Sequence, residues 1–120
     1  MIKGQLKKDI ECIAGYYGFW TQATKLAEEG AELSAALCKM TYLNRRVAKG
    51  RRNIRLIAKK KEQAKDEFLK ELADVLVVAE GIKFLLEADL FTGAEVSGNM
   101  RAKVQRQLER IKEEVLAEEE

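Results

Sequence analysis

The chain contains no histidine and no proline among its 120 residues, and it has only two cysteines. The absence of histidine excludes Ser-His-Asp triads, Cys-His dyads and zinc sites with histidine ligands. Any catalysis must therefore use carboxylates, lysine, arginine, hydroxyl groups or a metal ion. The absence of proline, in a chain dominated by Ala, Leu, Glu and Lys, favours helix throughout. We therefore expect an all-α protein.

Long apolar runs are also missing. The most apolar stretch, residues 72–86, is interrupted by three charged residues and predicts a core helix, not a membrane span. The N-terminal lysines are not followed by an apolar run, so we expect no signal peptide. Cys12 and Cys38 are isolated in the sequence and are expected to be reduced thiols in the core. We therefore expect a cytoplasmic protein with no membrane partner.

Helical periodicity extends from one end of the chain to the other. It predicts helices at 4–14, at about 22–44 with Thr21 as N-cap, from Asn53 or only Glu62 to about Ala88, and from Ala94 or Asn99 to Leu116. We expect chain breaks at Gly15 and Gly18, which flank Tyr16 and Tyr17, at Gly50, and between Asp89 and Gly93. No linker rich in Pro, Gly or Ser divides the chain, so residues 1–120 are expected to form a single domain. The pattern fits a four-helix-type bundle with two long antiparallel helices.

Two acidic clusters lie on the two predicted long helices. The first contains Glu28, Glu29 and Glu32, and the second contains Glu71 and Asp74. Residues three or four apart share one face of a helix, where like charges repel each other. Asp74 lies in the apolar run LADVLVVA, where a buried carboxylate is costly without a partner. A hard divalent cation, usually Mg²⁺, would join the two clusters, although acidic helix residues are also common on solvated faces.

These residues resemble the motif of the MazG-like all-α nucleoside triphosphate pyrophosphohydrolases, in which EExxE is followed by ExxD. Residues 28–32 read EEGAE, and residues 71–74 read ELAD. The segment GFWTQATKLAEE, which leads into the first motif, is similar to the corresponding segment of the family. In this comparison Trp20, Gln22 and Lys25 align with residues of the family's pattern. The similarity therefore extends beyond the acids themselves.

The resemblance spans about residues 16–112. The run KVQRQLERI resembles the family's C-terminal basic helix. In this run, Lys103 and Arg106 align with the positions that lie on the side of the substrate phosphates in the family. The connection between the two acidic helices is longer than in the compact members of the family. Phosphoribosyl-ATP pyrophosphatase, a relative with similar acids, resembles the chain less in the lead-in and in the C-terminal run.

The resemblance implies hydrolysis of a nucleoside triphosphate between its α and β phosphates, which gives a monophosphate and pyrophosphate. It implies that Mg²⁺, or Mn²⁺ in its place, is held by Glu29, Glu32, Glu71 and Asp74. Glu28 would be a further ligand or the base that orients the attacking water. A carboxylate base and a metal-activated water need no histidine, which agrees with the composition.

The resemblance also implies the substrate contacts and the assembly. Trp20 and Gln22 would contact the base, and Lys25 would be a further substrate-binding residue. Lys103 and Arg106 would neutralise the β and γ phosphates. Family members are dimers or tetramers, so we expect a homodimer or a homotetramer.

A basic segment offers a rival interpretation. Between Lys39 and Lys70 the chain has twelve Lys or Arg residues and three Asp or Glu residues, a local net charge of about +9. Residues 45–61 could belong to a helical nucleic-acid-binding module or to a purely structural bundle. The nucleic-acid-binding alternative does not explain Asp74, and a basic run is ordinarily the solvated end of a helical hairpin. In the structural alternative, the carboxylates would be paired surface charges. The leading interpretation therefore includes a nucleotide substrate and no nucleic acid partner.

Overall fold

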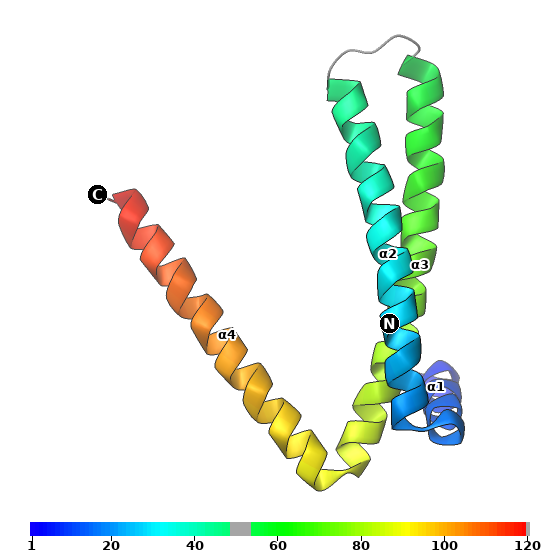
Figure 1. Ribbon diagram of the computed structural model, residues 1–120, viewed down its shortest axis with the longest axis vertical. Coiled ribbons are helices and arrows are strands. Elements are labelled where there is room, and N and C mark those ends of the chain that lie inside the picture. Colours follow the sequence, from blue (N-terminus) through cyan, green and yellow to red (C-terminus); the bar gives the residue numbers. More distant parts are fainter. Residues whose placement is uncertain (49–53, 120) are drawn as a thin grey trace. The chain divides into compact units, whose positions relative to one another are not determined.

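The computed structural model describes residues 1–48 and 54–119, and it is all-α (Figure 1). The described helices are α1 (Gly4–Tyr17), α2 (Phe19–Ala48), α3 (Ile54–Ala88) and α4 (Leu90–Glu119). The all-α prediction is confirmed, as are the two long antiparallel helices. The chain divides into two compact units, Met1–Leu85 and Leu86–Glu120, and the expected single domain stays a prediction. Within the described ranges, no helix combines the length and apolarity needed to cross a membrane.

Gly18 separates α1 from α2. Its φ of 86° suits glycine, and its N–H donates a 2.8 Å hydrogen bond to the carbonyl oxygen of Ala14. The predicted break at Gly18 is confirmed, whereas the one at Gly15 was wrong, because a glycine inside a helix costs only about 1 kcal/mol relative to alanine. α2 begins directly after Gly18, so Thr21 lies inside the helix and does not cap it.

The seam between α2 and α3 follows a seven-residue repeat. The two helices lie side by side and run in opposite directions (Figure 1). The buried positions are Gln22, Glu29, Ala36 and Leu43 on α2, and Ile57, Ala64 and Val78 on α3. Glu71, which is half-buried, occupies the remaining position of the repeat on α3. A seven-residue repeat is typical of helices packed as a coiled coil. Glu29 lies opposite Glu71. Steps of seven residues from this pair, taken in opposite directions along the two antiparallel chains, place Gln22 opposite Val78, Ala36 opposite Ala64 and Leu43 opposite Ile57.

The seam is narrower than the apolar stripes of the two helices. Leu37 and Leu69 belong to these stripes, yet they are 52% and 49% exposed. Two helices packed on each other cover only a narrow strip of each surface, so flanking apolar residues remain accessible. Cys12 and Cys38 are both free and exposed, so their predicted place in the core was wrong.

The turn between α3 and α4 is shorter than predicted. Asp89 caps α4, because its Oδ1 accepts a 3.1 Å hydrogen bond from the Thr92 N–H. A Cβ on Gly93 would collide with the carbonyl oxygen of Leu86, so the turn requires glycine. α4 begins at Leu90, before both of the starts that we predicted for it, Ala94 and Asn99.

Candidate metal and substrate site

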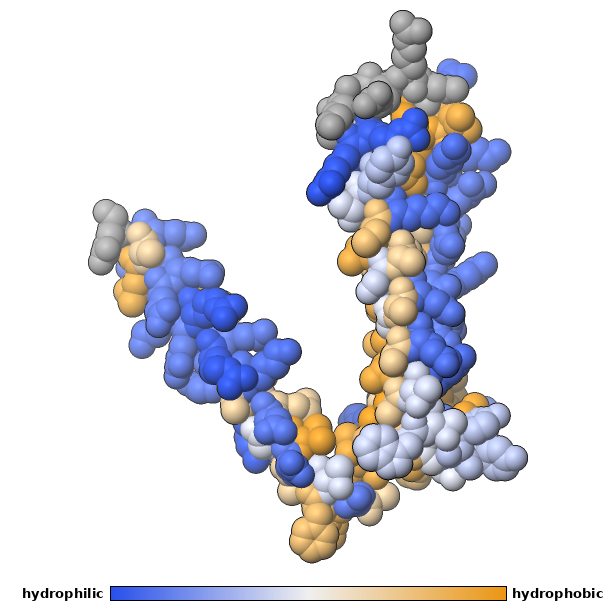
Figure 2. Space-filling view, in the orientation of Figure 1, coloured by the Kyte–Doolittle hydropathy of each residue, from blue (hydrophilic) through white to orange (hydrophobic). Residues whose placement is uncertain are grey.

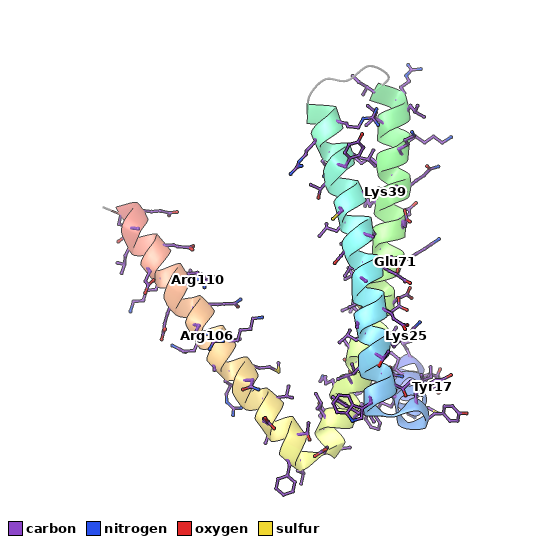
Figure 3. All side chains as sticks on the ribbon, viewed as in Figure 1. Tyr17, Lys25, Lys39, Glu71, Arg106 and Arg110 are labelled. Atoms are coloured by element: carbon purple, nitrogen blue, oxygen red, sulfur yellow. The ribbon has the colours of Figure 1, made fainter. Side chains whose placement is uncertain are left out.

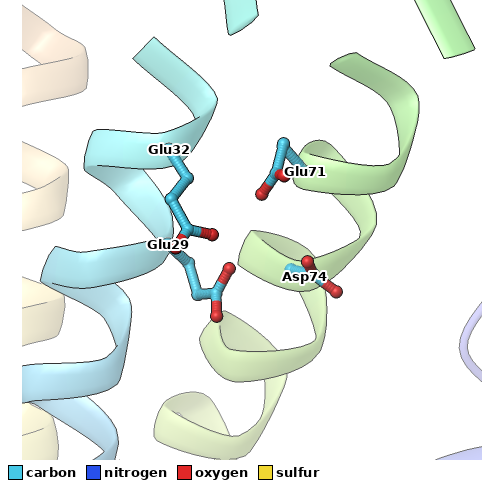
Figure 4. A group of neighbouring side chains, drawn as sticks. All are labelled: Glu29, Glu32, Glu71 and Asp74. Carbon is cyan, nitrogen blue, oxygen red and sulfur yellow. The ribbon is translucent and has the colours of Figure 1, made fainter. Parts of the chain in front are cut away.

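Four carboxylates from the two long helices come together at the seam. Glu29 and Glu32 extend from α2, and Glu71 and Asp74 belong to the facing part of α3 (Figure 4). One oxygen from each of the four lies within 4.8 Å of the others. Around Mg²⁺, ligand oxygens about 2.1 Å from the ion lie about 3 Å apart when adjacent and about 4.2 Å apart when opposite. The four predicted metal ligands therefore form a group of a size that a small divalent cation could occupy.

Two buried oxygens in this group lack hydrogen-bond partners. They are Oε2 of Glu29 and Oε2 of Glu71, and the side chain of Glu29 is only 8% exposed. A buried carboxylate oxygen without a donor is costly, and most such atoms in proteins are satisfied. Here they occupy a layer of the seam where a coiled coil normally has apolar side chains. A bound cation would supply the missing partner, so these residues fit a metal.

The acid that is buried is not the one we predicted. Asp74 is exposed, whereas Glu29 is buried. Apolar neighbours along the sequence suggested burial of Asp74, but it lies three residues after the seam position of Glu71, at the edge of the seam, so its carboxylate reaches the group of four and yet stays exposed. Glu28 is also exposed and lies outside the group of four, with its Oε2 4.0 Å from Lys25 Nζ.

Lys25 partly balances the charge of the acidic group. Its Nζ lies 2.9 Å from Oε1 of Glu29. This hydrogen bond and the positive charge of Lys25 lower the pKa of Glu29, and the same hydrogen bond raises the pKa of Lys25. The pKa of Glu32 is raised, chiefly by the negative charge of Glu29 and then by the neighbouring carboxylate of Glu71. Without a metal, the group is therefore stabilised by one lysine and by a tendency of Glu32 to hold a proton.

A pocket of about 460 Å³ adjoins the acidic group on the side of α1. It is lined by Ile13, Tyr17, Thr21, Gln22, Lys25, Glu29, Asp74, Val77 and Val78. Its volume is in the range of small-molecule sites, and its mixture of apolar walls and a few polar groups is typical of them. Figure 3 labels Tyr17 on α1, beside the lower end of the two long helices, with Lys25 and Glu71 higher along them. The structure thus brings two predicted substrate residues, Gln22 and Lys25, beside two predicted metal ligands.

Trp20 is not part of this pocket. It is 80% exposed, and its ring meets that of Phe19 edge to face with centroids 5.1 Å apart. The aromatic ring in the lining belongs to Tyr17, which we did not predict. Tyr17 lies four residues after Ile13, another lining residue on α1, and this helical spacing was the available signal.

The predicted phosphate contacts lie on another element. Lys103 and Arg106 are exposed residues of α4, in the second unit (Figure 3 labels Arg106). Nothing in the geometry of the acidic group depends on them. Their predicted role toward the β and γ phosphates therefore stays a prediction.

A second pocket, of about 280 Å³, adjoins the acidic group in the direction of the basic segment. It is lined by Glu32, Ala35, Ala36, Lys39, Glu67 and Glu71. Lys39 and Glu67 pair across the two helices at 3.1 Å. We did not predict these two residues near the site, although each lies on its helix within two turns of an acid of the group.

Comparisons of the chain with models of known protein families, with characterised proteins and with solved structures give no match. The function must therefore be inferred from the four carboxylates and the pocket beside them. The resemblance to the MazG-like motif supplies the reaction to be tested.

Proposed function

We propose that the chain is a Mg²⁺-dependent nucleoside triphosphate pyrophosphohydrolase that releases a nucleoside monophosphate and pyrophosphate. The observation that carries this proposal is the buried Oε2 of Glu29, which lacks a hydrogen-bond partner inside a group of four carboxylates. Four acids without a cation would repel a triphosphate, whereas a cation among them would attract it. The pocket beside the group has room for a nucleoside.

Glu29, Glu32, Glu71 and Asp74 would hold the metal. When bound, Mg²⁺ or Mn²⁺ supplies positive charge for the phosphate oxygens and lowers the pKa of a bound water. Glu28 is exposed beside Lys25 and is either a further ligand or the base that orients the attacking water.

The pocket on the side of α1 would receive the base and sugar. Val77 and Val78 provide an apolar wall, and the ring of Tyr17 provides a flat surface for contact with a base. The buried amide of Gln22 offers both donors and an acceptor to the edge of a base. Lys25 lines the same pocket and could exchange its contact with Glu29 for a substrate phosphate.

The remaining proposed contacts concern residues outside this pocket. Trp20, which is exposed outside the pocket, would contact the base from there. Lys103 and Arg106 of α4 would contact the β and γ phosphates. We also propose a cytoplasmic homodimer or homotetramer.

Pyrophosphate release from a panel of ribonucleotide and deoxyribonucleotide triphosphates tests the proposal. We expect release with Mg²⁺, none with a chelator, and the monophosphate as the other product. The double variant Glu32→Ala with Asp74→Ala should abolish release. Its matched control, Glu62→Ala with Asp66→Ala, changes two exposed acids of the same types and should retain it.

Circular dichroism would verify that both double variants remain helical. If the Glu32 and Asp74 variant stays folded and active, the assignment of the metal ligands is wrong. If the unmodified protein releases pyrophosphate from no nucleotide, the hairpin is a binding or structural element, and not this enzyme.

A further inference from the structure

The charge of the chain is divided very unequally along its length. The twenty-nine residues from Leu33 to Lys61 include ten Lys or Arg residues and no Asp or Glu. Although the chain as a whole has a net charge of +2, this segment alone carries +10. Such a concentration of one sign is the electrostatic feature that nucleic-acid-binding surfaces share.

The fold gathers several of these charges at one end of the hairpin. Leu43 and Ile57 are 4% and 2% exposed, so the end of α2 and the beginning of α3 are held together by a buried contact layer. The basic side chains next to this layer face the solvent; they include Arg45 on α2 and Arg55, Lys59 and Lys60 on α3. We call these four residues the basic end. Lys49, Arg51 and Arg52 lie outside the described residues and form no part of it.

The basic end is not neutralised by salt bridges within the described residues. Those found in residues 1–48 and 54–119 include none of its four members. In the upper part of Figure 2, hydrophilic side chains cover most of the visible face of α3. The charges are therefore available to an external anion.

The position of Arg55 is unfavourable for the isolated protein. α3 begins at Ile54, and its first turn contains no acidic residue. The N-terminus of a helix carries partial positive charge, so a cation there is destabilising and an anion is stabilising. Arg45, by contrast, lies in the last turn of α2, where a cation is favourable. Helix stability accounts for Arg45 but not for Arg55.

We propose that the basic end binds the phosphate backbone of double-stranded nucleic acid without sequence preference. A polyanion would neutralise the four basic side chains and the N-terminal end of α3 together. Arg45 lies thirteen residues after Glu32 along α2, about 20 Å at the rise of a helix, so the surface is separate from the acidic group. The inference therefore does not depend on the proposed hydrolase activity.

The surface suits a duplex backbone better than single strands. Proteins that bind single strands without sequence preference stack bases on aromatic rings. In the described part of the chain, the aromatic residue near the basic end is Tyr42. The guanidinium carbon of Arg46 lies over the Tyr42 ring, 5.7 Å from its centroid. The surface thus offers charge, but no free stacking platform beside it.

The test is binding of a fluorescent 20-base-pair duplex, measured by anisotropy at several salt concentrations. The triple variant Arg45→Gln, Arg55→Gln and Lys59→Gln removes charge at exposed positions and keeps good helix formers. The matched control Lys7→Gln, Lys8→Gln and Lys112→Gln removes the same charge at other exposed positions. Circular dichroism and pyrophosphate release are measured on all three proteins.

We expect the unmodified protein and the control to bind duplexes of unrelated sequence equally and with a steep salt dependence. The triple variant should bind at least about tenfold more weakly at low salt, with a salt slope smaller by about 2 to 3. Its helicity and pyrophosphate release should be unchanged. Equal weakening in the control would overturn the assignment to the basic end. So would an absence of duplex binding, tighter binding to a single strand, or binding only to vesicles of anionic lipid.

Discussion

Glu29 is the residue on which the functional interpretation depends. It occupies a position of the seam where Ala36 and Leu43 follow at seven-residue steps, and its carboxylate is nevertheless buried. Lys25 contacts one oxygen, while the other oxygen has no hydrogen-bond partner. An apolar side chain would fit this layer without these costs, so the buried acid supports the proposed metal site.

Replacing Glu32 with glutamine should distinguish two effects on stability, the repulsion between the carboxylates and the binding of a metal ion. Glu32→Gln removes a negative charge that is repelled by Glu29. Without metal, the variant should therefore melt at a higher temperature than the unmodified protein at neutral pH. Mg²⁺ at about one hundred times its Kd should stabilise the unmodified protein by about 2.7 kcal/mol and the variant by much less. Thermal melts with and without Mg²⁺ check this, with Glu62→Gln as control. A variant that keeps the full Mg²⁺ shift would show that Glu32 is not a ligand.

The same residue predicts a dependence on pH. In the folded protein the pKa of Glu32 is raised above its ordinary value of 4.5. A raised carboxyl pKa contributes stability below the unfolded pKa, and that stability is lost as the pH rises through the folded pKa. The melting temperatures of the metal-free unmodified protein and of Glu32→Gln should therefore be closest below pH 4.5 and diverge as the pH rises above it. A difference that is independent of pH would contradict this account of the acidic group.

At the scale of the helices, most of the fold was predictable from the sequence. The absence of proline and the helical periodicity predicted four helices, and α3 begins at Ile54, close to the earlier of its two expected starts. The seven-residue repeat was not predicted, because two of its α2 positions are Gln22 and Glu29, which a search for apolar stripes passes over. The motif identified the four acids, but only the register of the seam shows that Glu29 is the buried one.

The seam should dominate the stability of the hairpin. Ile57→Ala removes a side chain that is 2% exposed and should lower the free energy of unfolding by about 2–4 kcal/mol. Ile54→Ala, on the same helix, changes a side chain that is 65% exposed and should cost less than about 1 kcal/mol. Urea denaturation of both variants measures the difference. Equal losses would contradict the register proposed for α2 and α3.

The ends of the two long helices should respond oppositely to reversal of charge. Arg55→Glu places an anion in the first turn of α3 and should raise the free energy of unfolding by about 0.3–1 kcal/mol. Arg45→Glu places an anion in the last turn of α2 and should lower it by a similar amount. Urea denaturation at low salt checks both values. A loss of stability in the Arg55 variant would indicate that Arg55 itself stabilises the fold.

At the scale of the whole molecule, the first unit has a thin core. Of the apolar side chains that are buried in the described residues, three are alanines, and Leu37, Tyr42 and Leu69 are each about half exposed. Small chains with few buried apolar side chains commonly gain stability by association.

The proposed association predicts a stability that depends on concentration. A second copy that covers the exposed apolar side chains would favour the folded state by mass action. The melting temperature should therefore rise between about 5 and about 200 μM protein. Light scattering after size exclusion should show a dimer or a tetramer. A monomer with a constant melting temperature would contradict the expected homo-oligomer.

Binding of Mn²⁺ tests the central claim most directly, because the electron paramagnetic resonance signal of free Mn²⁺ is lost on binding. We predict saturable binding to the unmodified protein, competition by Mg²⁺, and loss of binding in Glu29→Gln but not in Glu62→Gln. Glutamine keeps the size of the buried side chain, so the folded variant reports on the carboxylate alone. If the unmodified protein binds no Mn²⁺, or if Glu29→Gln binds as tightly, the acidic group is not the metal site that we propose.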